Sequence, residues 1–414
     1  MPSKQSIDKV AKPDGEKGFL PSSDYVSDEA LDNLRFYKYA AVDKSYLTYY
    51  VLRHYWNWAV TLFPRWMAPN LITLTGLGFI GLNLLTIAYY MPDLEGPAPS
   101  WVYYGFALGM WLYSTFDNVD GKQARRTGSS SPLGELFDHG CDALNCAFGG
   151  LVQAAGLALG ESWYTVFVFN LTTLTFYLST WEEYHTGILY LGYINGPTEG
   201  LVLSCLTFIA SGYWGPQIWR SPLVSLAPSL LTGSLLESWE LRDLLVATMV
   251  LTAGIFHVAF CLVSVWKARK EKGLPYSPVI LQLLPLLLFL IGFNAWALAP
   301  HSTVLSNSGP HLLFPLILTS GIVFGRVATK IILAHLTKSP FPMWTVLLLP
   351  LLIGAALVHA NLLSPPQELY YLGIFALFAL SAYLHWALLV IDRFCTHLGI
   401  RCLHIPTKAE GKAN

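Results

Sequence analysis

The sequence predicts an all-α integral membrane protein with about ten transmembrane helices and an N-terminal interfacial amphipathic helix. Of its 414 residues, 54% are hydrophobic and only 12% are charged, whereas a soluble domain carries about 25% charged residues. Long apolar stretches also recur along most of the chain. The formal net charge of -1 gives no global basic field, so we expect no nucleic-acid partner.

Residues 1–66 form the first predicted unit, a cytoplasmic leader followed by the interfacial helix. The leader is polar and shows no apolar segment of the kind that a signal peptide requires. Residues 45–66 are rich in Tyr and Trp and also contain Arg53, His54 and Arg65. This mixture favours a helix in the lipid headgroup zone over a first transmembrane helix that is merely polar.

The predicted spans follow from length, because a helix needs roughly 20 mostly apolar residues to cross a bilayer. Segment 220–242 is apolar but interrupted by prolines, so we expect a loop or a re-entrant piece there. About ten stretches meet or approach the required length: 70–91, 100–119, 142–160, 163–181, 197–213, 243–266, 277–298, 312–335, 342–361 and 368–391.

The basic residues of the loops predict the orientation of these spans. If the N-terminus is cytoplasmic, the opposite side holds only Arg220 and Arg242. An excess of Lys and Arg marks the cytoplasmic side of membrane proteins, so we expect both chain ends there. The residues on that side are Lys122, Arg125, Arg126, Lys267, Arg269, Lys270, Lys272, Lys338, Arg393, Arg401, Lys408 and Lys412.

Four aspartates stand where the second predicted span ends and the third begins. Asp117 and Asp120 are three residues apart, and Asp138 and Asp142 are four apart, so each pair shares one helix face. The linker 127–134 is rich in Gly, Ser and Pro, which lets the chain reverse. We therefore expect an antiparallel helix pair that presents four carboxylates to one space.

Four such acids repel one another unless a cation lies between them, and solvated loop residues would not be paired at helical spacing. Mg²⁺ binds carboxylate and phosphate oxygens, and two ions about 4 Å apart can hold a phosphoryl group from both sides. The surrounding residues suit a nucleotide diphosphate. Small residues that let it approach the backbone and cations that offset its charge are Gly121, Ala124, Gly134, Lys122 and Arg125.

The pattern D117-x2-D120-G121-x2-A124-R125-x8-G134-x3-D138-x3-D142 resembles the signature of the CDP-alcohol phosphotransferase family at all eight fixed positions. The resemblance implies that Asp117, Asp120 and Asp138 bind Mg²⁺ or Mn²⁺, that Asp142 assists metal binding or acts as the base, and that CMP is released. It also implies that residues 67–213 are the catalytic helices, 214–392 additional transmembrane helices, and 393–414 a cytoplasmic tail.

Further segments resemble the eukaryotic choline/ethanolamine branch of that family: APNLITLTG at 68–76, FDHGCDALN at 137–145, WEEYHTG at 181–187 and NGPTEG at 195–200. This resemblance implies transfer of phosphocholine or phosphoethanolamine from CDP-choline or CDP-ethanolamine to diacylglycerol. It also implies a homodimer in the endoplasmic reticulum or Golgi membrane, with its active site facing the cytosol. The alternatives are an enzyme that uses CDP-diacylglycerol, an inactive scaffold, and a cation-coupled transporter, which usually shows internal repeats.

His139 and Asp142 are both candidates for the base that deprotonates the diacylglycerol hydroxyl. His139 is the titratable group beside the aspartates, and its other interpretation is a residue that orients Asp138 or Asp142. Asp142 can instead be occupied by metal. The sequence leaves this choice open.

Two substrate contacts are also predicted. Trp181, Glu182, Glu183 and Tyr184 combine aromatic faces with carboxylates, which suits the choline cation, although an interfacial aromatic belt with solvated acids gives the same pattern. Asn70 precedes the first span and either caps that helix or contacts the nucleotide; we favour the cap.

Overall fold

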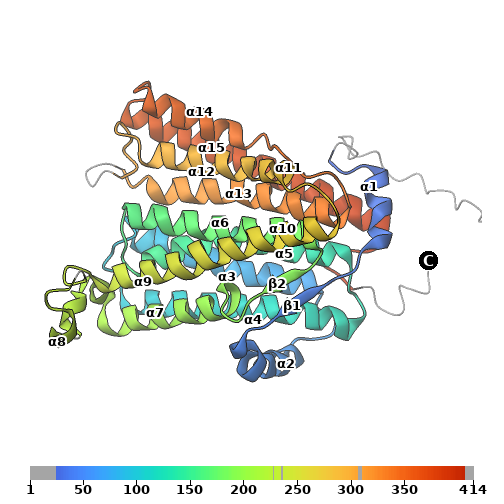
Figure 1. Cartoon of the computed structure of the whole chain (residues 1–414), viewed down its shortest axis with the longest axis horizontal. Helices are drawn as coiled ribbons and strands as arrows, with labels where there is room; N and C mark the ends of the chain where they lie inside the picture. Colours follow the sequence, from blue (N-terminus) through green and yellow to red (C-terminus); the bar gives the residue numbers. More distant parts are fainter. Residues whose placement is uncertain (1–24, 227, 235, 306–309, 406–414) are drawn as a thin grey trace, which may run out of the picture.

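The computed structural model describes residues 25–226, 228–234, 236–305 and 310–405. Its long helices run side by side and correspond to the predicted apolar stretches (Figure 1). Their bounds are α3 Pro69–Tyr90, α4 Ser100–Thr127, α5 Pro132–Gly156, α6 Trp163–Thr186, α7 Leu201–Trp214, α9 Leu241–Met249, α10 Val258–Glu271, α12 Leu284–Ala297, α13 Leu313–Leu336, α14 Leu348–His359 and α15 Pro365–Leu398. A π-helical stretch, Val250–His257, joins α9 to α10 without a break.

Within the described residues, five helices are long and apolar enough to cross a membrane: Pro69–Tyr90, Leu241–Glu271, Ser277–Ala297, Leu313–Leu336 and Pro365–Leu398. Helices α4, α5 and α6 are long enough but are not among the five. Helices α7 and α14 are shorter, with 14 and 12 residues. The chain is therefore an all-α, multi-pass membrane protein, whereas a count of ten spans stays a prediction.

Helix α13 lies at the centre of the bundle. In its most apolar stretch 83% of residues are buried inside the protein, against 22% for α15. Helix α13 packs against α5, α6 and α15, while α3 and α7 pack against α4. Glycines allow the closest approaches, since a Cβ at Gly354 of α14 would lie only 2.2 Å from the Trp296 ring of α12.

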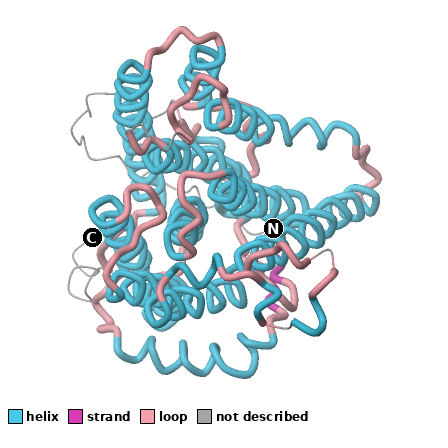
Figure 2. Tube along the Cα trace, turned by 90° about the vertical axis from the view of Figure 1, so that its left-hand side faces the viewer, coloured by secondary structure: helices cyan, strands magenta, loops and turns pink. Residues whose placement is uncertain are grey.

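The connections add short elements. Figure 2, which looks along the bundle, shows helices throughout and two short strands lying together. These strands, β1 Ala41–Asp43 and β2 Leu189–Leu191, pair in parallel and were not predicted. Short helices are α1 Asp28–Asp32 and α8 Pro228–Leu231, whereas α11 Ser277–Ile280 is the first turn of the Ser277–Ala297 helix. The described residues between 220 and 240 form loops and short helical turns, in agreement with the expectation of a loop there.

The N-terminal segment packs on the helices that end the chain. Val26, Leu31 and Leu34 are buried against side chains of α5, α13 and α15. A helix forms inside the predicted range 45–66, where a π-helical turn, Thr48–Leu52, leads into α2 (Arg53–Leu62). Residues 1–24 and 406–414, which include Lys408 and Lys412, lie outside the described part. Helix α15 continues to Leu398, beyond the predicted start of the tail at residue 393.

Candidate active site

The turn between α4 and α5 brings the aspartates together. Helix α4 is capped at its C-terminus by Gly128, whose φ of 69° lies in the left-handed region that glycine tolerates. Ser131 caps the N-terminus of α5, since its hydroxyl accepts from the Gly134 N–H at 3.2 Å, and Pro132 follows at the first helical position. The chain thus reverses within a few residues, as the Gly-, Ser- and Pro-rich linker predicts.

Asp117, Asp138 and Asp142 each offer a carboxylate oxygen, and these oxygens lie within 4.8 Å of one another. The Tyr113 hydroxyl, one turn before Asp117, donates to Asp142. Asp117 Oδ1 and Asp138 Oδ1 are buried and have no hydrogen-bond partner among the described residues. Buried carboxylate oxygens without donors fit a cation ligand set, so these three residues match a divalent metal site.

Asp120, the remaining aspartate of the motif, stands outside this trio. Its side chain is buried and accepts from the hydroxyl of Thr73 on α3, and its carboxylate lies beside that of Asp138. Thr73 was not predicted. Its only signal in the sequence is a hydroxyl within an apolar span.

The two cations expected to contact phosphate, Arg125 and Lys122, lie in different surroundings. Gly121 faces the Arg125 guanidinium, because a Cβ on Gly121 would lie 3.6 Å from Arg125 Nη1. Arg125 is exposed and Ala124 half-buried. Lys122 instead donates to the side chain of Asn57 on α2 at 2.8 Å. Arg125 is therefore the cation placed over the small residues, and Lys122 is held against α2.

Asn70 does not cap the first long helix, so that prediction is wrong. Because Pro69 occupies the first helical position, the cap is Ala68, which has no side-chain hydrogen bond. Asn70 is buried and its amide donates to Cys402 Sγ at 3.5 Å. Its Oδ1 would lie 3.8 Å from a Cβ on Gly134, so Asn70 lies beside the small residue that opens α5.

A second cluster of titratable groups adjoins the motif. Glu135, Glu183 and His335 offer ligand atoms within 4.8 Å of one another, and His139 Nδ1 lies 3.9 Å from Glu183 Oε2. The Tyr37 hydroxyl donates to Glu135, and partial burial together with the Glu135 carboxylate raises the pKa of Tyr37. Glu135 could have been found from its position within the motif.

The aromatic and acidic segment Trp181–Tyr184 does not form one pocket in this structure. Trp181 Nε1 donates to Gln282 at 3.0 Å, Cys261 Sγ donates to Glu182 at 3.3 Å, and the Tyr184 hydroxyl donates to the Ser339 carbonyl at 2.9 Å. Only Glu183 faces His139. The four side chains thus contact four different parts of the chain.

Residues 66–210 match the family model described as CDP-alcohol phosphatidyltransferase. The chain is 37% identical over 392 residues to choline/ethanolaminephosphotransferase 1 of Arabidopsis thaliana, covering 93% of this chain and 99% of that protein. It is also 37% identical over 329 residues to cholinephosphotransferase 1 of Saccharomyces cerevisiae, covering 77% and 81% of the two chains.

Proposed function

The chain belongs to the CDP-alcohol phosphatidyltransferase family, and we propose that it transfers phosphocholine or phosphoethanolamine from the CDP-alcohol to diacylglycerol, releasing CMP. The names of its relatives, which it matches along nearly their whole length, support both head groups as substrates. The observation that carries the proposal is the trio Asp117, Asp138 and Asp142, whose carboxylate oxygens converge within the eight-position motif.

We propose that Asp117, Asp138 and Asp142 hold a divalent cation, Mg²⁺ or Mn²⁺, and that Asp120 contributes to a second one. When bound, the metal neutralises the diphosphate and polarises its phosphoryl oxygens. Asp120 is positioned by Thr73, and Asp142 by Tyr113. Gly121, Ala124 and Gly134 let the nucleotide approach the backbone, and Asn70 lies beside Gly134. The exposed Arg125 offsets the negative charge of the departing CMP.

The reaction is an in-line displacement. A base removes the proton of the diacylglycerol hydroxyl, whose oxygen bonds to the phosphorus nearest the amino alcohol. The bond from that phosphorus to the bridging oxygen breaks, and CMP leaves with the electron pair. The chain's contribution is positioning and charge compensation. Trapping a covalent phosphoenzyme with CDP-choline alone would contradict this single step.

The geometry favours His139 over Asp142 as the base. Asp142 accepts from Tyr113 through Oδ1 and offers an oxygen beside those of Asp117 and Asp138, so its carboxylate already has a role in the proposed metal site. His139 is buried, lies one residue from Asp138, and its Nδ1 is 3.9 Å from Glu183. A carboxylate at that distance stabilises the imidazolium that forms when His139 takes the proton.

The wider arrangement is also a proposal. Helices α3 to α7, α9 with α10, and α12 to α15 correspond in order to the predicted ten spans. The exposed Tyr49, Tyr50, Trp58 and Trp66 support an interfacial position for the α2 region. A homodimer in the endoplasmic reticulum or Golgi membrane, with the aspartates facing the cytosol, remains a prediction. Cysteine accessibility in sealed microsomes and cross-linking test the orientation and the dimer.

The decisive experiment measures CMP release by purified protein in detergent with diacylglycerol and Mg²⁺, comparing CDP-choline with CDP-ethanolamine. We expect release that needs both diacylglycerol and metal and is lost in Asp138→Ala. Asp32→Ala, at an exposed aspartate, is the matched control and should behave as wild type. Absence of release with either donor would overturn the assignment, and turnover with CDP-diacylglycerol instead would move the chain to another branch of the family.

A further inference from the structure

A cavity of about 460 Å³ lies at the end of the bundle away from the aspartates. Glu95, Gly160 and Arg220 line it from the connections at that end, Trp163 and Tyr164 from the start of α6, and Arg242 from the start of α9. Helix α4 starts at Ser100, 17 residues before Asp117. At a rise of about 1.5 Å per residue, about 25 Å of helix separates the two ends, which approaches the thickness of a bilayer core.

Exposed aromatic side chains mark this end as a membrane boundary. Tyr89, Trp101, Trp163, Tyr213 and Trp214 are each more than half exposed, and they lie where α3 and α7 end and where α4 and α6 begin. Tyr and Trp collect at the level of lipid head groups. The cavity therefore opens where head groups are the most abundant ligand.

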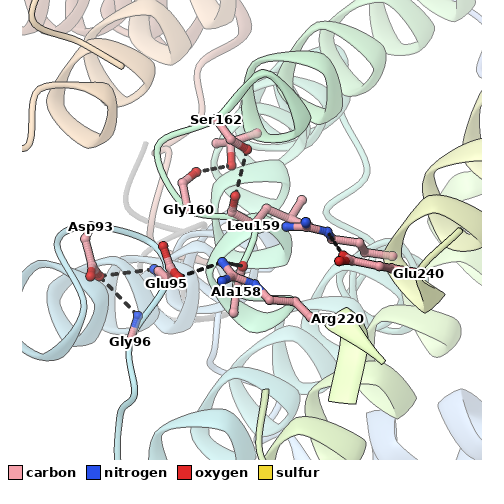
Figure 3. Close-up of polar contacts among 11 residues, drawn as sticks. Asp93, Glu95, Gly96, Ala158, Leu159, Gly160, Ser162, Arg220 and Glu240 are labelled. Atoms are coloured by element: carbon pink, nitrogen blue, oxygen red, sulfur yellow. Dashed lines mark hydrogen bonds and ion pairs between the residues drawn. The ribbon is translucent and has the colours of Figure 1, made fainter. Parts of the chain in front are cut away.

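The cavity contains two arginine side chains that keep N–H donors for a further ligand. Figure 3 shows Arg220 reaching between Glu95 and the Ala158 carbonyl; its Nη2 lies 2.7 Å from Glu95 Oε1 and 3.3 Å from that carbonyl. Arg220 Nε has no hydrogen-bond partner among the described residues. The Arg242 guanidinium stacks 4.7 Å from the Tyr164 ring centre and pairs with Glu240 at 2.6 Å. A guanidinium has five N–H donors, so both retain donors suited to a phosphate.

The cavity also carries features that attract a cation. Glu95 is held beside Gly160, where a Cβ would lie 3.1 Å from Glu95 Oε2. Trp163 stacks on Tyr164 with ring centres 3.9 Å apart and leaves 55% of its surface exposed. An aromatic face beside a carboxylate suits an ammonium group. Because carboxylates line the same space as the arginines, a purely anionic ligand would meet repulsion there.

We propose that this cavity binds the head group of a zwitterionic phospholipid, with its phosphate at Arg220 and Arg242 and its ammonium at Glu95 and Trp163. The volume falls within the range of about 300–1,000 Å³ usual for ligand sites. The site is separate from the aspartates and does not depend on the reaction proposed for them. Free phosphocholine shares the same chemistry, so the experiment includes it.

Native mass spectrometry of the full, delipidated protein would count bound lipid during titration with phosphatidylcholine, phosphatidylglycerol of the same acyl chains, or free phosphocholine. We expect Arg242→Gln to weaken one phosphatidylcholine site about tenfold and Trp163→Ala to weaken it about threefold. Lys267→Gln, which removes an exposed charge toward the opposite end of the same Leu241–Glu271 helix as Arg242, should leave binding unchanged. None of the three positions is among the residues proposed to act on the substrates, so CMP release should persist in each variant.

Three results would overturn the proposal. One is unchanged phosphatidylcholine binding in both cavity variants. Another is an equal loss of phosphatidylglycerol, which would mean that the cavity recognises phosphate alone. The third is phosphocholine binding as tightly as the lipid. If Arg242→Gln does not fold, Trp163→Ala decides, since its ring lies mostly at the surface.

Discussion

Replacing His139 with alanine tests the proposed mechanism most directly. General-base catalysis contributes about 10²–10⁴-fold to rate, which corresponds to about 2.7–5.5 kcal/mol of barrier. The His139 side chain is only 9% exposed and faces Glu183, so solvent has little access with which to replace it. Since the proton moves in the transition state, kcat and kcat/KM should fall together, while the KM for CDP-choline should change little.

The assay is CMP release at saturating Mg²⁺ in mixed micelles, with CDP-choline varied at saturating diacylglycerol and diacylglycerol varied at saturating CDP-choline. His335→Ala is the matched control, because His335 contacts the same Glu135–Glu183 pair from α13 but is not proposed to take the proton. A His139→Ala enzyme that keeps a third of the wild-type kcat would refute the assignment. An equal loss in His335→Ala would show that the whole cluster, rather than one base, sustains the rate.

Three further predictions concern the metal ligands, head-group choice and packing. Asp117→Asn should raise the Mg²⁺ concentration for half-maximal activity by about tenfold or more, measured by metal titration, because it weakens one of three converging ligands; an unchanged titration would exclude Asp117. Glu182→Gln should leave the ratio of CDP-choline to CDP-ethanolamine turnover within about twofold of the wild-type ratio, since the Glu182 carboxylate is occupied by a hydrogen bond from Cys261. A larger change would support the head-group pocket predicted at Trp181–Tyr184. Gly354→Ala should lower the unfolding free energy by about 1–3 kcal/mol, seen as a lower melting temperature, because its Cβ would strike Trp296; Gly373→Ala, with nothing within 4 Å, should not.

Local spacing was enough to predict the turn and the meeting of Asp117, Asp138 and Asp142, but it placed Asp120 with them, whereas Asp120 stands apart. Asp117 and Asp138 lie on neighbouring helices joined by a short linker, so helix periodicity and chain reversal together determine where they meet. The same reasoning failed for Asn70, because the effect of Pro69 on the cap position outweighs the preference of Asn for caps.

The second cluster could not be predicted from spacing. His335 and Tyr37 reach Glu135 from positions about 200 and 98 residues away, and no local pattern marks either residue. The strands β1 and β2 have three residues each, too few to show the alternation that identifies a strand. The segment Trp181–Tyr184 has the composition of a cation pocket, but side chains four in a row on a helix point in different directions.

The contact between the two ends of the described chain has a consequence for biosynthesis. Arg393 Nη2 lies 2.6 Å from Asp28, and the Asn33 side chain donates to the Thr337 carbonyl at 2.9 Å. The segment around Asp28 therefore cannot reach its final position until α15, which follows it far along the chain, has been synthesised and inserted. Since Tyr37 follows this segment and donates to Glu135 beside the aspartates, we expect that hydrogen bond to form late and nascent chains that stop before α15 to lack it.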